Sequence, residues 1–149
     1  PCNLFGPNDN YDLKNSHFLP ALIKKIYLAS KKSKKNKIVK LWGTGKPLRE
    51  VLYVDEVADA CEFFLRKKIN KTLINIGSTT EMTIKEYADL IKKKIDPEVL
   101  IKFNNDKKLD GVMRKKLNLS LASQYGWKPK MNFLKVLDKI IEEFKNSKS

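Results

Sequence analysis

His17 is the only histidine in this chain of 149 residues, and it lies in a stretch with the composition of a functional loop. Residues 1–20 read PCNLFGPNDNYDLKNSHFLP; they are rich in Asn, Asp and Pro and show almost no hydrophobic period. Compact domains tolerate long irregular loops mainly where the loops form binding or catalytic surfaces. The sequence therefore predicts an active-site loop over residues 1–20, with His17 as its candidate catalytic group.

The residues around His17 favour a helix N-terminus. Asn15 and Ser16 are good N-caps for the apolar run that follows, and Pro20 is tolerated in a first turn. A helix dipole disfavours the imidazolium there and favours a neutral ring that exchanges protons near neutral pH. These residues alone leave two interpretations open: a group that transfers protons, or an ordinary surface histidine beside a cap.

Hydrophobic spacing predicts the elements that position this loop. The expected helices are residues 18–30, a helix capped by Asp55 that runs through Leu65, a helix opened by the capping box of Thr83 and Glu86, and helices at 120–125 and 133–144. The expected strands are residues 38–42, 48–54, 72–77 and 99–103. The first two strands flank GTGKP, which indicates a hairpin or a tight strand connection. Cys61, in the helix that follows, is expected to be a small buried side chain. This order of elements predicts an α/β fold.

Trp42 and Arg49 frame the GTGKP turn. Together they could hold a base by stacking and a phosphate by a bidentate ion pair, although Trp42 equally fits a place in the core. The turn lacks the third glycine of a dinucleotide fingerprint, and a strand follows it. It is therefore neither that fingerprint nor a P-loop.

Two polar segments are candidates for anion binding. The loop at 104–118 carries Lys108 and Arg114 close to Gly111, which suits an anion site and a solvated loop equally well. The run KKSKKNK at 31–37 reads as a solvated basic loop in preference to a phosphate patch.

The net charge of +14 comes almost entirely from lysine. Readers of DNA sequence rely on arginine, so this excess argues against specific DNA binding but leaves non-specific polyanion binding open. The two cysteines fit neither a disulfide framework nor a metal cluster, and with one histidine no metal site is expected. No run reads as a signal peptide or a membrane span, so we expect a cytoplasmic protein with no membrane partner.

Three stretches together resemble the GDP-L-fucose synthase family, the epimerase/reductases among the extended short-chain dehydrogenases. PCNLFGPNDNYDLKNSHFLPAL is similar to P-T-N-[LY]-[YF]-G-P-x-D-N-[FY]-x-x-x-x-S-H-[VF]-[IL]-P-A-L. LWGTGKPLREVLYVDEVADA resembles W-G-[ST]-G-x-P-x-R-E-F-[LI]-[HY]-V-[DE]-D-[ML]-A-x-A, and KKLDGVMRKKLN resembles the segment that contains K-P-D-G-T-P-R-K. All 149 residues correspond in order to the C-terminal half of such an enzyme. Other nucleotide-sugar epimerases or dehydratases of the superfamily are the alternative.

The resemblance implies the C-terminal substrate-binding part of a Rossmann-type fold, without the N-terminal cofactor half, as a single region over 1–149. It implies a part in the NADP-dependent conversion of GDP-4-keto-6-deoxy-D-mannose to GDP-L-fucose, with His17 as the general acid of epimerisation. Pro1, Asn3 and Leu4 correspond to positions beside the cofactor, as does His17. The positions that correspond to substrate contacts are Asn3, Lys25, Trp42, Arg49, Lys108 and Arg114.

The chain also departs from the family pattern. Lys25 stands where an arginine is common, and KLDGVMRK lacks both prolines of KPDGTPRK. Cys2 replaces a threonine and is not the family's catalytic cysteine. The chain contains no Gly-rich cofactor turn, and none of its stretches resembles the family segment that carries the reductive tyrosine and lysine. We therefore expect a longer native protein, a homodimer in its complete form, and no turnover by this part alone. A free-standing basic module that binds nucleotides or nucleic acid is the rival hypothesis, with nucleic acid the less expected partner.

Overall fold

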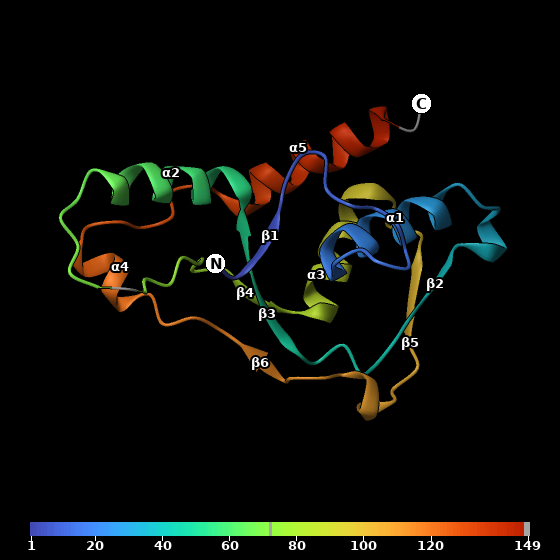
Figure 1. Ribbon diagram of the computed structural model, residues 1–149. Helices are drawn as coiled ribbons and strands as arrows, with labels where there is room; N and C mark the ends of the chain where they lie inside the picture. The colour runs from blue at the N-terminus through green and yellow to red at the C-terminus, as the bar shows by residue number, and fades with distance from the viewer. Residues whose placement is uncertain (72, 148–149) are drawn as a thin grey trace.

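The computed structural model describes residues 1–71 and 73–147 of the chain. Its longest strand, β3 (Leu48–Tyr53), runs through the middle of the molecule and organises the larger of two sheets (Figure 1). The first half of β3 pairs antiparallel with β4 (Glu81–Thr83) and, on its other edge, parallel with β6 (Arg114–Lys115). Its second half pairs in parallel with β1 (Asn3–Phe5). β1 and β6 therefore follow each other along one edge of β3.

The smaller sheet consists of β2 (Ile38–Leu41) and β5 (Leu100–Phe103), which pair in parallel. Of the two interpretations of the GTGKP turn, the hairpin is wrong and the tight connection between two strands is confirmed. The turn at 43–47 carries the chain from one sheet to the other, because the inner face of β2 is buried against α1 (Phe18–Ser30) and its edge is paired with β5. Both sheets contain parallel pairs connected by helices, so the predicted α/β class is confirmed.

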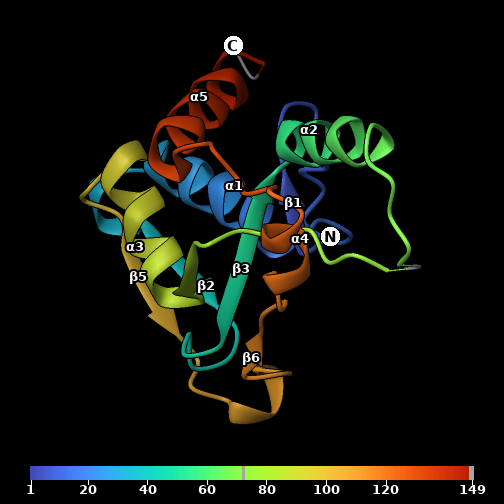
Figure 2. The same cartoon turned by 90° about the vertical axis from the view of Figure 1, so that its left-hand side faces the viewer.

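Three helices enclose the main hydrophobic core together with both sheets (Figure 2). These are α1, α3 (Ile84–Ile95) and α5 (Phe133–Asn146), which lie where the hydrophobic period predicts them. The capping box before α3 is confirmed: the Thr83 hydroxyl accepts from the Glu86 N–H at 3.1 Å, and the Glu86 carboxylate accepts from the Thr83 N–H at 2.7 Å. The apolar face of α5 is buried as expected.

A second, smaller cluster lies between α2 (Val54–Leu65) and α4 (Ser120–Gln124). Its centre is Trp127, which is 2% exposed and packs with Ala60 and Ala122. The Trp127 indole donates to Asp59 at 2.9 Å. The buried carboxylate of Glu56 accepts the backbone N–H groups of residues 130 and 131. These contacts fasten α2 to the segment that leads into α5.

Three local predictions fail. Asp55 does not cap α2, since Tyr53 is the N-cap and Asp55 lies in the first turn. Cys61 is exposed, because it lies on the face of α2 that is turned away from both cores. Residues 73–77 form no strand and Leu73 is exposed, whereas Thr72, also part of that prediction, lies outside the described residues.

The basic segment 31–37 contains a short 3₁₀ turn, η1 (Lys34–Asn36), and residues 31–36 are all exposed. Lys37 differs from them. Its ammonium is 2.7 Å from the carboxylate of Asp96 and 2.9 Å from that of Glu98, which ties the segment to the end of α3. These contacts lower the pKa of both carboxyls.

Candidate functional site

The first residues of the chain form one wall of a cavity of about 500 Å³. Residues 1–7 and Asp9 line the cavity from β1 and the following loop, His17 lines it from the start of α1, and Val54 and Lys115 lie on α2 and β6. All four residues predicted to lie beside a cofactor are among them. Natural sites for small molecules span about 300–1,000 Å³, so the cavity has the size of a ligand site.

His17 is the N-cap residue of α1, so the predicted place at a helix N-terminus is confirmed. The predicted caps are wrong: Asn15 and Ser16 instead fold back over Asp12, whose carbonyl accepts their N–H groups at 3.1 and 2.7 Å. The imidazole is exposed and makes no capping hydrogen bond. The turn thus presents the ring to the cavity without using it to hold the helix.

Asn3 is fixed by its side chain, which donates to the Glu50 carbonyl at 2.9 Å. Glu50 is completely buried, and its carboxylate accepts the N–H of Ser78 at 2.6 Å and that of Leu117 at 2.9 Å. Hydrogen bonds from backbone N–H groups stabilise a buried carboxylate. A Cβ at Gly77 would collide with this carboxylate, so only glycine fits there. The buried side chain of Glu50 therefore joins three segments behind the cavity wall: β3, the backbone at Ser78 and the backbone at Leu117.

Cys2 also lines the cavity but is unsuited to act as a base or nucleophile. Burial, followed by the proximity of the Glu50 carboxylate, raises the pKa of its thiol to about 12. A thiol in this setting stays protonated at neutral pH, and the thiolate is the reactive form. This agrees with the expectation that Cys2 is not a catalytic cysteine.

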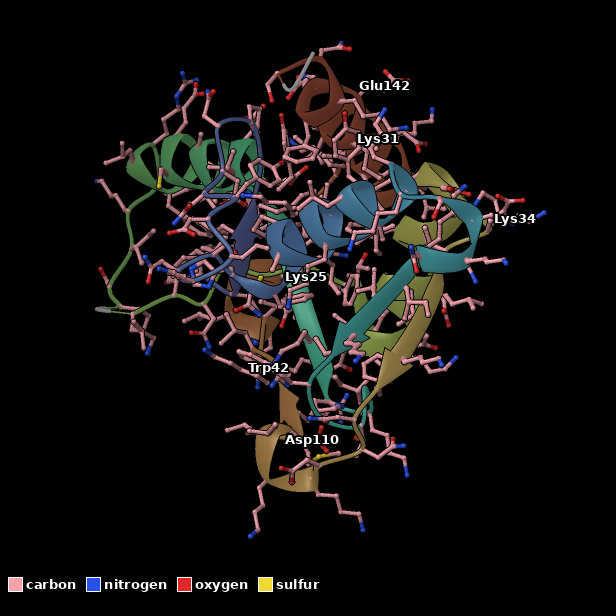
Figure 3. All side chains as sticks on the ribbon, turned by 90° about the vertical axis from the view of Figure 1, so that its right-hand side faces the viewer. Lys25, Lys31, Lys34, Trp42, Asp110 and Glu142 are labelled. Atoms are coloured by element: carbon pink, nitrogen blue, oxygen red, sulfur yellow. The ribbon has the colours of Figure 1, made fainter. Side chains whose placement is uncertain are left out.

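A second group of predicted residues lies around Trp42, at the corner where β2 ends (Figure 3). The Trp42 side chain is 74% exposed, which rules out the core alternative. The ammonium of Lys25, from α1, lies 5.3 Å from the centre of the indole ring. An exposed indole with a neighbouring cation is suited to stack a base and attract a phosphate.

Side chains from the 104–118 segment hold the backbone turn next to Trp42. The Asp110 carboxylate accepts the Thr44 N–H at 2.6 Å and the Thr44 hydroxyl at 2.8 Å, and the Asn104 side chain accepts the Gly43 N–H at 2.9 Å. The backbone hydrogen bond from Thr44 is the main reason that the pKa of Asp110 lies below its usual value. We call Trp42, Lys25 and this turn the Trp42 corner.

The remaining predicted residues differ in their surroundings. Arg49 uses one guanidinium nitrogen to donate to the carbonyls of Leu48 at 2.8 Å and Val112 at 2.7 Å, and so holds the 104–118 segment to β3. Arg114 forms a two-pronged ion pair with Glu81, at 3.0 and 2.8 Å, and this pair lowers the pKa of Glu81. Lys108 is exposed in the short turn η2 (Lys107–Leu109). Arg114 thus faces a carboxylate of the fold and not the cavity.

Outside the predicted loop 1–20, sequence reasoning missed both described residues that line the cavity, Val54 and Lys115. Lys115 follows Arg114 directly, and neighbouring residues of a strand point to opposite faces. This alternation would have separated the two cations, but a strand of two residues is too short to be recognised in a polar sequence.

Within residues 1–71 and 73–147, no cluster of His, Cys, Asp and Glu is arranged to bind a metal ion. Both cysteines are free thiols. Over the same residues, none of the helices has both the length and the apolar character needed to cross a bilayer.

Comparison with known proteins relates this chain to enzymes that act on sugar nucleotides. GDP-L-fucose synthase 1 of Arabidopsis thaliana is 42% identical over 132 residues, which are 89% of this chain and 40% of that protein. GDP-L-fucose synthase of Sinorhizobium fredii is 38% identical over 144 residues, covering 97% of this chain and 45% of that protein. The chain therefore spans less than half the length of these relatives.

Solved structures give the same relation. The crystal structure of a GDP-L-fucose synthetase from Naegleria fowleri bound to NADP superimposes with a TM-score of 0.84 at 25% identity, over 98% of this chain and 45% of that one. The model of the NAD dependent epimerase/dehydratase family matches residues 1–77. This match covers β1 with the His17 loop, the Trp42 corner and α2, and on this basis the chain belongs to the NAD dependent epimerase/dehydratase family.

Proposed function

We propose that this chain is the substrate-binding part of an NADP-dependent GDP-L-fucose synthase, which converts GDP-4-keto-6-deoxy-D-mannose to GDP-L-fucose. The observation that carries the proposal is the cavity shared by His17, on a helix N-terminus, and Asn3, on a parallel strand. The identities of about 40% with GDP-L-fucose synthases, across most of the chain, support the same substrate.

His17 has the role of a proton donor in this proposal. The C4 ketone of the sugar acidifies the protons on C3 and C5, and a base elsewhere in the complete enzyme removes one of them to leave an enolate. His17 then delivers its ring proton to the opposite face of that carbon, which inverts the centre. An exposed ring with no capping bond is suited to donate a proton and take up another from solvent.

The cavity fits only one end of the cofactor. Pro1 and Leu4 line it with apolar groups suited to the face of a nicotinamide, and Asn3 adds a polar side chain, but the sequence has no Gly-rich turn for the phosphates. When bound, NADPH supplies the hydride that reduces C4. The chain's own residues would enclose the sugar and hold its C3 to C5 edge toward His17.

The Trp42 corner is proposed to hold the nucleotide. The indole would stack on guanine, and Lys25 and Lys108 would supply positive charge near the phosphates. Arg49 is better suited to support this corner than to bind phosphate directly, because its bonds to Leu48 and Val112 use both hydrogens of one nitrogen.

We also propose that the complete enzyme is a cytoplasmic homodimer.

The test is proton exchange by the complete enzyme that contains this chain. In D₂O and without NADPH, epimerisation incorporates deuterium at C3 and C5, which NMR of the sugar detects. We expect His17→Gln to slow this exchange by about 10²- to 10⁴-fold, the usual contribution of a general acid. Affinity for GDP should stay unchanged, because the ring is not part of the proposed nucleotide site.

Lys14→Gln is the matched control, since Lys14 is an exposed residue of the same loop and does not line the cavity. It should exchange at the wild-type rate. Deuterium incorporation by His17→Gln at the rate of this control would remove His17 from proton transfer.

A further inference from the structure

The small sheet of β2 and β5 has one face in the main core and one face toward solvent. Alternate residues of β2 are buried, which leaves Ile38 and Lys40 on the outer face. The parallel register places Leu100 opposite Ile38 and Lys102 opposite Lys40. Both lysines are exposed, and Leu100 is 54% exposed. We call these four residues the β2–β5 face; Figure 3 looks at the side of the molecule where the two strands lie.

Lys40 and Lys102 bring two positive charges together across the strands. Like charges directly opposite each other destabilise a sheet. Among the residues that the structure describes, neither lysine takes part in an ion pair, whereas Lys34 and Lys37 approach the carboxylate of Glu98 at 3.5 and 2.9 Å. The pair therefore costs stability in the protein alone, and a negatively charged partner would offset that cost.

The positive charge continues beyond the strands into η1. Lys34 and Lys35 are exposed in this turn, which directly precedes the end of β2 with Ile38 and its partner Leu100. Two aliphatic side chains thus lie between two pairs of lysines. A protein that rests on a bilayer needs this order, because cations meet the headgroups while aliphatic groups reach the acyl boundary.

The composition of the β2–β5 face separates a membrane from a nucleic acid. Sites for single-stranded nucleic acid combine cations with aromatic rings on which the bases stack, and arginine is the preferred phosphate ligand. The β2–β5 face has neither an aromatic ring nor an arginine. The expectation of no membrane partner came from the lack of a spanning run, which has no bearing on a contact with the membrane surface.

We propose that the β2–β5 face, together with η1, binds reversibly to a membrane surface that is rich in anionic phospholipid. The lysines contact the headgroups and Leu100 enters the interface. The proposal is independent of the proposed function, because none of these residues lines the cavity beside His17.

The experiment measures sedimentation of the purified protein with vesicles at low salt. We expect binding to vesicles rich in phosphatidylglycerol, no binding to pure phosphatidylcholine, and release at about 0.5 M salt, where charges are screened within a few ångströms. A lysine near an anionic membrane contributes about fivefold, so Lys40→Gln combined with Lys102→Gln should weaken binding by about thirtyfold. Leu100→Ser should weaken it by about three- to tenfold without a change in charge.

The loop after α2 provides the matched controls, because it lies at the other end of the molecule from β2 and β5 (Figure 1). Lys68 and Lys71 are exposed there, and their combined change to glutamine removes the same charge. Leu65 is 87% exposed at the end of α2, so Leu65→Ser matches Leu100→Ser. Both controls should bind vesicles within about twofold of wild type.

Lys40→Glu separates loss of binding from loss of structure. It places opposite charges across the strands, so the melting temperature should stay the same or rise while vesicle binding falls. Equal vesicle affinities for the Lys40/Lys102 variant and the Lys68/Lys71 variant would overturn the proposal. A preference for single-stranded RNA over the anionic vesicles would also overturn it.

Discussion

The cavity lined by residues 1–7 and His17, which we call the His17 cavity, and the Trp42 corner are built in different ways. The cavity wall consists of residues that lie next to one another in the sequence, and it is supported from behind by the buried carboxylate of Glu50. The corner is assembled from α1, the turn after β2 and the 104–118 segment, and polar side chains near the surface clasp it. The cavity therefore depends on the core of the protein, and the corner depends on a local turn.

This difference separates stability from binding. Damage to the support of the cavity should unfold the protein, since Glu50 joins β3 to two other segments. Damage to the corner should loosen one surface region and leave the main core folded, because Trp42 is exposed and contributes nothing to that core.

The largest expected effect is that of Glu50→Ala. The buried N–H of Ser78 and the partly buried N–H of Leu117 lose their acceptor, and a buried group left in this way costs about 1–3 kcal/mol. We expect the free energy of unfolding to fall by about 2–5 kcal/mol in urea titrations. Glu62→Ala removes an exposed carboxylate paired with Arg66 and should cost less than about 1 kcal/mol. Similar losses for the two variants would show that Glu50 does not support the wall.

A smaller loss is expected from Gly45→Ala at the corner. Gly45 has φ +74°, and a Cβ there would lie 2.6 Å from the ring of Phe103. Backbone strain and overpacking together should cost about 2–4 kcal/mol. Gly111→Ala is the control, with φ +62° and open space around the new carbon, so it isolates the backbone strain of about 1–2 kcal/mol. Equal losses would mean that Phe103 moves aside without cost.

The corner should also respond to acid. Because the pKa of Asp110 is lowered in the folded protein, its contribution is complete above the unfolded pKa of about 3.9. The contribution is lost as pH falls through the lower folded value. We expect the indole NMR signal of exposed Trp42 to broaden in this range while that of buried Trp127 persists. Asp110→Asn should show the Trp42 change already at neutral pH, and an acid response shared equally by both indoles would point to general unfolding.

The smallest expected effect is that of salt on the affinity for GDP, and it separates the proposed enzyme from the rival basic module. Proteins that contact six to ten phosphates lose about 10³–10⁵ in affinity between about 50 and 200 mM salt. GDP held by two or three cations should lose about tenfold or less over this range. A binding preference for single-stranded RNA over GDP, with the steep salt dependence, would favour the rival, and the exposed lysines at 31–35 would then be its binding surface.

Elements with a strong period or cap were predictable from the sequence. α1, α3 and α5 carry apolar residues at helical spacing, and the pair of Thr83 and Glu86 fixes the start of α3. His17 was predictable as a helix N-terminal residue for the same reason, although the cap itself was not. Local physics decides these features, so one stretch of sequence contains enough information.

Features decided by distant partners were not predictable. β1, β4 and β6 have two or three residues each and exist because β3 offers both of its edges. The sequence left both a hairpin and a tight strand connection open after β2, because a glycine turn fits equally well between strands of one sheet or of two. Which of Arg114 and Lys115 lines the cavity depends on which face of β3 meets the cavity. The ion pair of Arg114 with Glu81 on the neighbouring strand places Arg114 on the other face.

The parallel pairing of β1 with β3 sets an order of events during synthesis on the ribosome. The side chain of Asn3 can form its hydrogen bond only when the carbonyl of Glu50, 47 positions later, has been synthesised. The Cys2 N–H likewise needs the carbonyl of Ile76. α1 contains its own hydrogen bonds and can form while these partners are still inside the exit tunnel. The loop with His17 therefore leaves the tunnel together with the α1 segment well before the opposite wall exists. A nascent-chain crosslink between positions 3 and 51 should appear only after β3 has emerged.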